Sequence, residues 1–199
     1  MTTTRNITTK SAALCLGAML LLGAGCASGR RAAPPLGPDD EPIVRVAVTP
    51  MVRATPQEVR EGVGTSVTKG LLKGLERRGI QAVAPAAEAV APKLEEDDLK
   101  ESSPESVRAV GPADERLVLV VFLTDWSSKI TFGSTCTVEV SGYLLDKRTG
   151  RVVWHAKGNG KAGQGGLIGM AMKRASDHDA IAFAVANLMA QFPRAVSRT

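Results

Sequence analysis

Aromatic residues, possible disulfide partners and excess charge are all scarce in this sequence. Phenylalanine, tryptophan and tyrosine make up 4% of the 199 residues, so the core must be built from valine, leucine, isoleucine and alanine. The formal charge is +5, and two of the positive side chains, Arg5 and Lys10, belong to the N-terminal segment. The remaining excess of positive charge is too small to indicate a nucleic-acid partner.

Catalytic motifs are missing as well. The chain contains no Gly-x-Ser-x-Gly, His-Glu-x-x-His or Cys-x-x-Cys pattern, and the glycine run 163–169 has neither the spacing of a dinucleotide loop nor the lysine of a P-loop. His178 lies between Asp177 and Asp179, but adjacent residues on a helix point about 100° apart and do not converge on one ion. We therefore predict a protein that is not an enzyme and that uses no cofactor and no metal.

The N-terminus has the order of a secretory signal. Residues 1–10 are polar and basic, and residues 11–25 are apolar and small, a stretch too short to span a bilayer as a helix. The apolar run ends in Leu22-Gly-Ala-Gly-Cys26, which resembles the lipobox of bacterial lipoproteins. That resemblance implies a signal peptide over residues 1–25 and acyl chains, palmitate among them, on Cys26. A short uncleaved membrane anchor is the alternative.

The resemblance also implies a location. Ala27 follows the cysteine, where lipoproteins retained in the inner membrane typically carry aspartate, so outer-membrane sorting with the domain facing the periplasm is implied. Several acyl chains on one residue give stable membrane attachment where one chain would not. Residues 26–42 are rich in proline and glycine and predict an extended tether. Residues 43–193 then form the single domain, and residues 194–199 form a tail.

The first part of that domain predicts a β-α-β unit. Residues 43–49 form a strand, and a helix is expected from Thr55 and Pro56 to Gly79, with an apolar residue at every fourth position from Val59 to Leu75. Four glycines within the helix, at positions 62, 64, 70 and 74, are interpreted as packing contacts. Residues 80–84 form the next strand. Residues 85–111, with prolines and acidic side chains, predict a solvated loop with one short helix.

The central sheet follows. Residues 117–123 are an unbroken apolar run, which is typical of a strand covered on both faces. We expect the strand to break at Asp125-Trp126 and a hairpin to follow, with strands at 135–145 and 151–155 and a turn from Asp146 to Gly150. Cys136 is expected to be a small buried residue of this hairpin. A glycine-rich segment from 158 leads to a long helix over 167–192, and the result is an α/β fold with a mixed sheet.

Several of these segments resemble a known group when they are taken together. Thr124-Asp-Trp126, the hairpin ending in Trp154 and Gly165-Gly-Leu-Ile-Gly169 before an alanine-rich helix are similar to an uncharacterised family of bacterial surface and periplasmic lipoproteins. That family is similar to the N-terminal domain of the translocation protein TolB and to the periplasmic domain of curli-type secretion lipoproteins. The resemblance covers residues 43–192 and implies accessory roles in envelope assembly or export, in some members as rings.

Three functional hypotheses follow. The first is a non-enzymatic outer-membrane lipoprotein whose domain acts as an oligomeric or docking component in envelope assembly or export, with self-association or other envelope proteins as partners. Its candidate interface is the glycine-rich segment Gly165, Gly166, Leu167, Ile168 and Gly169. The second is a periplasmic module that binds a ligand, or a peptide added as a strand to the sheet edge. The third is a hydrolase built on Asp125, His155 and Asp146.

Overall fold

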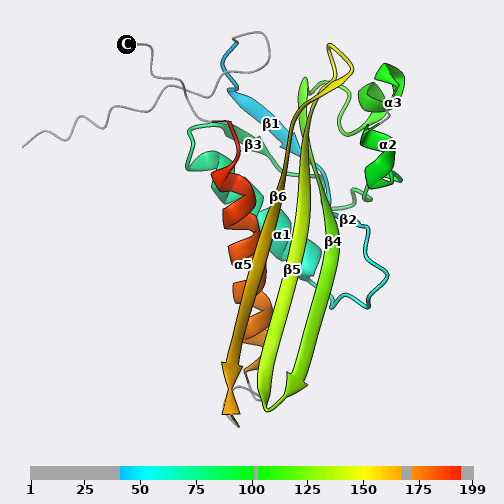
Figure 1. Ribbon diagram of the computed structural model, residues 1–199. Coiled ribbons are helices and arrows are strands. Elements are labelled where there is room, and N and C mark those ends of the chain that lie inside the picture. The colour runs from blue at the N-terminus through cyan, green and yellow to red at the C-terminus, as the bar shows by residue number, and fades with distance from the viewer. Residues whose placement is uncertain (1–40, 101–102, 167–171, 194–199) are drawn as a thin grey trace, which may run out of the picture. The chain divides into compact units, whose positions relative to one another are not determined.

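The computed structural model describes residues 41–100, 103–166 and 172–193 (Figure 1). The predicted signal peptide, Cys26, almost all of the predicted tether and the predicted tail lie outside the described residues. The buried apolar side chains that form the core lie between Ile43 and Phe192. The core is therefore built within the predicted domain.

The described residues form a mixed α/β fold with six strands and four helices. The strands are β1 (Arg45–Val48), β2 (Val52–Arg53), β3 (Gln81–Val83), β4 (Leu117–Thr131), β5 (Gly133–Asp146) and β6 (Arg151–Gly165). The helices are α1 (Val63–Glu76), α2 (Glu96–Lys100), α3 (Pro104–Ala109) and α5 (Lys173–Ala190). The predicted loop between β3 and β4 thus holds two short helices where one was expected.

All six strands belong to one open sheet. Its order is β3-β1-β4-β5-β6, and β2 pairs with β4 beyond the end of β1. β1 is parallel to both β3 and β4, so β1, α1 and β3 form the predicted β-α-β unit. β4, β5 and β6 are antiparallel and form a long three-stranded meander. The predicted mixed sheet is confirmed.

The first half of β4 is covered on both faces, as its unbroken apolar run predicts. Leu119 and Val121 pack in a cluster with residues of α1 and α5, whereas Val120 and Phe122 pack in a second cluster with Leu99 of α2 and with α3. Successive side chains of a strand point to opposite faces, so an all-apolar run requires a layer of structure on each side.

α1 begins later than the sequence predicts. The expected start at Thr55-Pro56 is wrong because Val52 and Arg53 pair with β4 and hold this part of the chain extended along the sheet. The helix starts at Val63 after Gly62, which has a φ of +84°. The apolar face of α1 is otherwise as predicted, since Val63, Val67, Leu71 and Leu75 are all buried.

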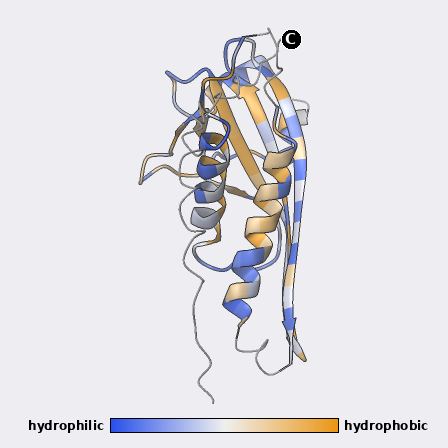
Figure 2. Ribbon diagram, turned by 90° about the vertical axis from the view of Figure 1, so that its left-hand side faces the viewer, coloured by the Kyte–Doolittle hydropathy of each residue, from blue (hydrophilic) through white to orange (hydrophobic). Residues whose placement is uncertain are grey.

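The glycines of α1 allow close contact between α1 and α5. A Cβ atom on Gly70 would lie 3.0 Å from Val185 of α5, and one on Gly74 would lie 2.8 Å from Met189. The interpretation of the glycines as contact residues is confirmed for Gly70 and Gly74. It is wrong for Gly62, which precedes the helix and where an added Cβ atom would meet no atom within 4 Å. In Figure 2 the first turns of α5 are hydrophilic and the later turns are mostly apolar.

The meander is longer than predicted. β4 continues through Asp125-Trp126, and the expected break is a register shift between Leu123 and Asp125. β6 extends to Gly165, although its glycines predicted a loop. These glycines let α5 pack directly on the strand, because a Cβ atom on Gly160 would lie 1.9 Å from the carbonyl oxygen of Ala180. The predicted helix over 167–192 is observed as α5 from Lys173 to Ala190, so its predicted extension to Met172 is wrong. Residues 167–171 lie outside the described residues.

Candidate functional site: the tip of the meander and the cleft beside it

The end of β4 and the turn that follows it expose two large apolar side chains. Phe132 is 81% exposed and Ile130 is 48% exposed. Gly133 follows with a φ of +128°, and a Cβ atom there would lie 2.3 Å from the carbonyl oxygen of Gln164 on β6. The turn thus requires glycine at 133, and it places Phe132 at the end of the sheet (Figure 1).

The glycines predicted as an interface lie beside this turn. Gly165 pairs with Gly133, and the backbone N–H of Gly166 donates to the carbonyl oxygen of Phe132 at 3.3 Å. Added Cβ atoms on Gly165 and Gly166 would meet no atom within 4 Å, so the side-chain positions of these two glycines are open toward the surface. We call the surface formed by Ile130, Phe132, Gly165 and Gly166 the meander tip. The other predicted interface residues, Leu167, Ile168 and Gly169, lie outside the described residues.

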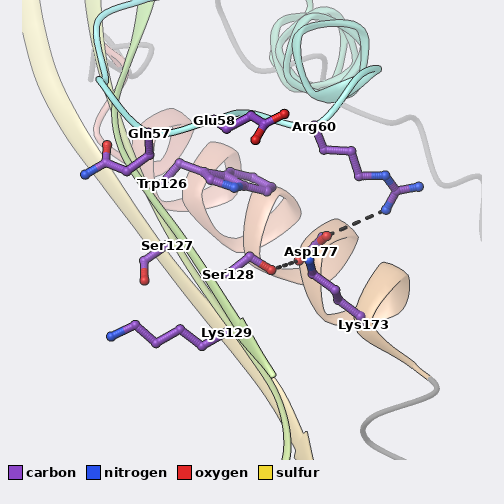
Figure 3. Close-up of a pocket in the computed structure, with 9 residues that line it drawn as sticks. All are labelled: Gln57, Glu58, Arg60, Trp126, Ser127, Ser128, Lys129, Lys173 and Asp177. Atoms are coloured by element: carbon purple, nitrogen blue, oxygen red, sulfur yellow. Dashed lines mark hydrogen bonds and ion pairs between the residues drawn. The ribbon is translucent and has the colours of Figure 1, made fainter. Parts of the chain in front are cut away.

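A polar cleft lies between the second half of β4, the segment before α1 and the start of α5 (Figure 3). Its volume is about 480 Å³. The lining includes the buried ring of Trp126, and the charged side chains around it are Glu58, Arg60, Lys129, Lys173 and Asp177. The cleft carries both signs of charge.

Asp177 connects α5 to β4 in this cleft. Its side chain is buried, and Ser128 donates a hydrogen bond of 2.8 Å to Oδ1. Arg60 places Nη1 3.6 Å from Oδ2. The expectation that His178 and its two aspartates do not converge is confirmed, because Asp177 points inward whereas His178 and Asp179 are exposed. Sequence reasoning missed the link to Ser128, which joins residues far apart in the chain.

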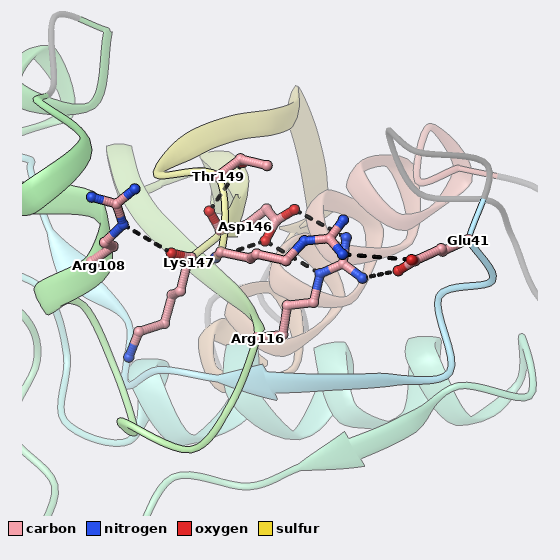
Figure 4. A network of polar contacts seen from close by, with 7 residues as sticks. Glu41, Arg108, Arg116, Asp146, Lys147 and Thr149 are labelled. Carbon is pink, nitrogen blue, oxygen red and sulfur yellow. Dashed lines mark hydrogen bonds and ion pairs between the residues drawn. The ribbon is translucent and has the colours of Figure 1, made fainter.

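A network of ion pairs closes the opposite end of the meander (Figure 4). Arg116, just before β4, donates to both carboxylate oxygens of Asp146 at 3.3 and 3.1 Å and also to Glu41. The backbone N–H of Arg148 donates to Asp146 at 2.9 Å, and Gly150 completes the predicted turn with a φ of +70°. This network ties the β5–β6 turn to the start of β4 and to the segment where the chain enters the domain.

The network fixes the charge state of Asp146. Burial favours a higher pKa for this carboxyl, but the hydrogen bonds from Arg116 and from the backbone of Arg148 outweigh it, and the pKa falls below its ordinary value. The same hydrogen bond to Asp146 raises the pKa of Arg116. Asp146 is therefore an ionised structural carboxylate whose hydrogen bonds go to its own turn and to Arg116.

The three residues of the hydrolase hypothesis are not brought together. Asp125 is opposite Glu139, which is opposite Asn159 on β6, and Asp146 is opposite Arg151. His155 lies four residues from each of those β6 positions, which is about 13 Å along a strand. Its ring stacks on Tyr143 with centroids 4.2 Å apart. The structure thus offers no triad from these residues.

Two further ionisable groups of the sheet are buried. Cys136 is fully buried, as predicted, and burial raises the pKa of its thiol to about 12. Burial, together with a hydrogen bond of 2.8 Å to Glu96, raises the pKa of Tyr143. Both groups are neutral at physiological pH and serve packing.

Within residues 41–100, 103–166 and 172–193, no group of three or more histidine, cysteine, aspartate or glutamate side chains is placed to hold a metal ion. None of the described helices has the length and apolar character needed to cross a membrane.

Comparison with known proteins found no matching family model and no matching curated protein. Among solved structures, the chain is similar to the PelC dodecamer from Paraburkholderia phytofirmans, with 20% identity, 79% of this chain and 93% of that chain covered, and a TM-score of 0.46. It is similar to lipoprotein GNA1162 from Neisseria meningitidis, with 17% identity, coverage of 66% and 93%, and a TM-score of 0.44.

A minor lipoprotein from Acinetobacter baumannii has 7% identity, coverage of 75% and 90%, and a TM-score of 0.42. Two of these three proteins are bacterial lipoproteins. At these identities and TM-scores, the likeness assigns this chain neither a family nor a function. The predicted resemblance to TolB and to curli-type lipoproteins stays a prediction.

Proposed function

We propose that this chain is a non-enzymatic lipoprotein of the outer membrane that faces the periplasm and acts as a docking or oligomeric component in envelope assembly or export. The observation that carries the proposal is the exposed aromatic side chain of Phe132 at the meander tip, next to Ile130. Large apolar side chains clustered on a surface are characteristic of interaction sites. Phe132 is held at the end of paired strands, where it can enter an apolar pocket of a partner.

The position of the tip supports this role. Arg45 begins β1 beside the start of β4, whereas the tip is at the other end of β4 (Figure 1). β4 has 15 residues and is therefore about 50 Å long. A chain attached to a membrane ahead of β1 would present the tip to components at a distance from its point of attachment.

Membrane attachment is tested at Cys26. We expect the wild-type chain to incorporate labelled palmitate and to fractionate with the outer membrane, because acylation at this residue is the attachment that the lipobox resemblance implies. Cys26→Ser should abolish the label and release the protein, while Cys136→Ala should change neither result. Label retained by Cys26→Ser would contradict the assignment of this cysteine.

The docking role is tested by placing a photo-crosslinking amino acid at Phe132 in the native envelope. We expect a discrete adduct with another envelope protein or with a second copy of the chain. The same probe at Val44, which is also apolar and 57% exposed but lies just ahead of β1, is the matched control. An equal pattern at both positions, or none at Phe132, would overturn docking through the tip.

A second function, the binding of an apolar ligand, is favoured by one cavity. It has a volume of about 590 Å³ and lies where β1 ends at Val48, between the segment after β3 and the end of α3. Its lining includes Pro50, Pro85, Leu94 and Val110. The connection from β1 to β3 covers one face of the sheet with α1, and the connection from β3 to β4 covers the other face with α2 and α3. In open α/β sheets, the carboxyl ends of strands between such connections are a common place for ligands.

Native mass spectrometry of the purified chain separates the two functions. A small molecule that co-purifies, and that is lost from Ala109→Trp because the larger ring fills the cavity, would favour the binding module. A chain that carries no small molecule, together with an adduct at Phe132, would favour docking. Ala86→Ser, also at the cavity, is the conservative control.

A further inference from the structure

A groove runs between α1 and α5 on the outer side of the helical layer. Its volume is about 600 Å³, and its α5 side begins at His178 and includes alanines one turn apart, at positions 182, 186 and 190. These alanines are exposed, although Ile181 and Val185 beside them are buried in the core. An apolar helix face that remains exposed after the core is complete is a surface suited to docking.

The α1 side of this helix groove is basic. Lys69, Lys73 and Arg77 are exposed and follow one another at intervals of four residues, so they form one row along the helix. Arg78 adds a fourth cation, and it donates to the backbone carbonyl of Met189. No aspartate or glutamate lines the groove among the described residues. The groove therefore suits a partner that is apolar and acidic.

The same chain carries such a surface on the other face of the sheet. Val90 is 82% exposed, and Glu88, Glu95, Asp97 and Asp98 are exposed near it in sequence, together with one exposed cation, Lys93. Glu96 is not part of this acidic patch, because it accepts the hydrogen bond of Tyr143. The α1 and α5 side chains belong to one core cluster and Leu99 of α2 belongs to the other, so the sheet separates the groove from the acidic patch.

We propose that the helix groove binds the acidic patch of a second copy of this chain. Val90 packs over the alanines of α5, and Glu88 and Glu95 face the cationic row of α1. Because the sheet separates the two surfaces, a copy does not fill its own groove with its own patch. The contact is head-to-tail, and repetition of it produces a ring when the rotation between copies closes.

The contact rests on the oligomeric role proposed for the domain and gives that role a mechanism. It differs from docking at the meander tip in its dependence on salt. A contact between exposed cations and carboxylates weakens as salt screens the charges, whereas an apolar contact through Phe132 does not. The two surfaces are therefore tested separately.

The experiment is sedimentation equilibrium of the chain from Ser28 to Thr199, whose core lies within Ile43–Phe192. We expect a discrete oligomer that dissociates as the salt concentration rises from about 0.05 to 0.5 M. Lys69→Glu with Lys73→Glu should weaken association by roughly 100-fold. Glu88→Lys with Glu95→Lys should do the same, and all four changes in one chain should restore the oligomer.

Arg151→Glu with Arg174→Glu is the matched control, since it reverses two exposed cations outside the groove. Equal circular dichroism and equal melting temperatures show that each variant is folded. A wild-type chain that is monomeric throughout would overturn both the contact and the oligomeric role. An oligomer that persists in the Lys69→Glu, Lys73→Glu variant, or that the fourfold variant does not restore, would overturn this contact alone.

Discussion

The two halves of β4 differ in how much structure covers them. Leu117 to Leu123 is buried along its whole length, between α1 and α5 on one face and α2 and α3 on the other. From Thr124 to Thr131 only Trp126 is buried, and the strand ends in exposed residues. One continuous strand thus passes from the core to the surface.

This difference in burial indicates different roles: the first half of β4 stabilises the fold, and the second half leads to the surface proposed for recognition. The first half of β4 supplies the apolar contacts that hold the domain together, because each of its faces is removed from water. The second half carries the half-exposed Ile130 near its end, and the exposed Phe132 follows in the turn, so these two side chains contribute little to the free energy of folding. Residues retained there for recognition should tolerate substitution, whereas residues under the helices should not.

The largest expected effect tests the boundary between covered and uncovered parts of the meander. Gly160→Ala places a Cβ atom 1.9 Å from the carbonyl oxygen of Ala180, so α5 must move away from β6. We expect a loss of about 3 kcal/mol or more in the free energy of unfolding, measured in urea. Gly165→Ala meets no atom within 4 Å and should change it by less than about 0.5 kcal/mol. Similar losses for both would contradict the comparison.

The next effect concerns Asp146, which accepts hydrogen bonds from Arg116 just before β4 and so links the start of β4 to the β5–β6 turn. Asp146→Asn removes the charge that Arg116 and the backbone of Arg148 bind, and we expect a loss of about 3 kcal/mol near neutral pH. The folded state lowers the pKa of Asp146, so the unfolded state binds more protons in this range. Its stabilisation is complete above the ordinary pKa of 3.8 and is lost as the pH falls through the lower, folded value.

Urea unfolding measured from about pH 2 to pH 6 checks this sign, because Asp146→Asn should flatten the acid side of the curve. Glu41→Gln is a useful control, since Glu41 also pairs with Arg116 but is exposed, and its loss should have little effect. A wild-type curve and an Asp146→Asn curve with the same acid slope would refute the assignment.

The smallest effects compare two polar contacts, one beside the covered first half of β4 and one beside its less covered second half. Tyr143→Phe removes the hydrogen bond to Glu96 beneath α2 and should cost about 1 kcal/mol. Lys157→Ala removes an exposed ion pair with Glu139 and should cost less than about 0.5 kcal/mol. Thermal unfolding of both variants shows which loss of stability is larger. A larger loss for Lys157→Ala would show that the less covered part of the meander contributes more to stability than its burial indicates.

Much of the fold could be predicted because its signals are local. The unbroken apolar run of β4 required cover on both faces, and the apolar residues of α1 recur at helical spacing. The start of α1 could not be predicted in the same way. Thr55 and Pro56 form an acceptable helix start in isolation, but pairing of Val52 with β4 keeps the chain extended there.

The candidate site was predicted in part. The glycines at 165 and 166 were singled out from sequence, and the structure places them beside Phe132. Phe132 itself was missed because a single apolar residue before a glycine has the pattern of a buried strand end as well as that of an exposed turn. Its exposure depends on the length of β5 and β6, and Gly158 and Gly160 had predicted a loop in β6.

By itself the sequence determined the α/β class, the β-α-β start, the doubly covered strand and the turn from Asp146 to Gly150, because each follows from periodicity or turn chemistry within one segment. Only the tertiary structure decided that β6 continues beneath α5, that Asp177 bonds to Ser128 and that Phe132 remains exposed. Each of these depends on which distant segment of the chain packs against the residue, and a local sequence pattern does not specify that segment.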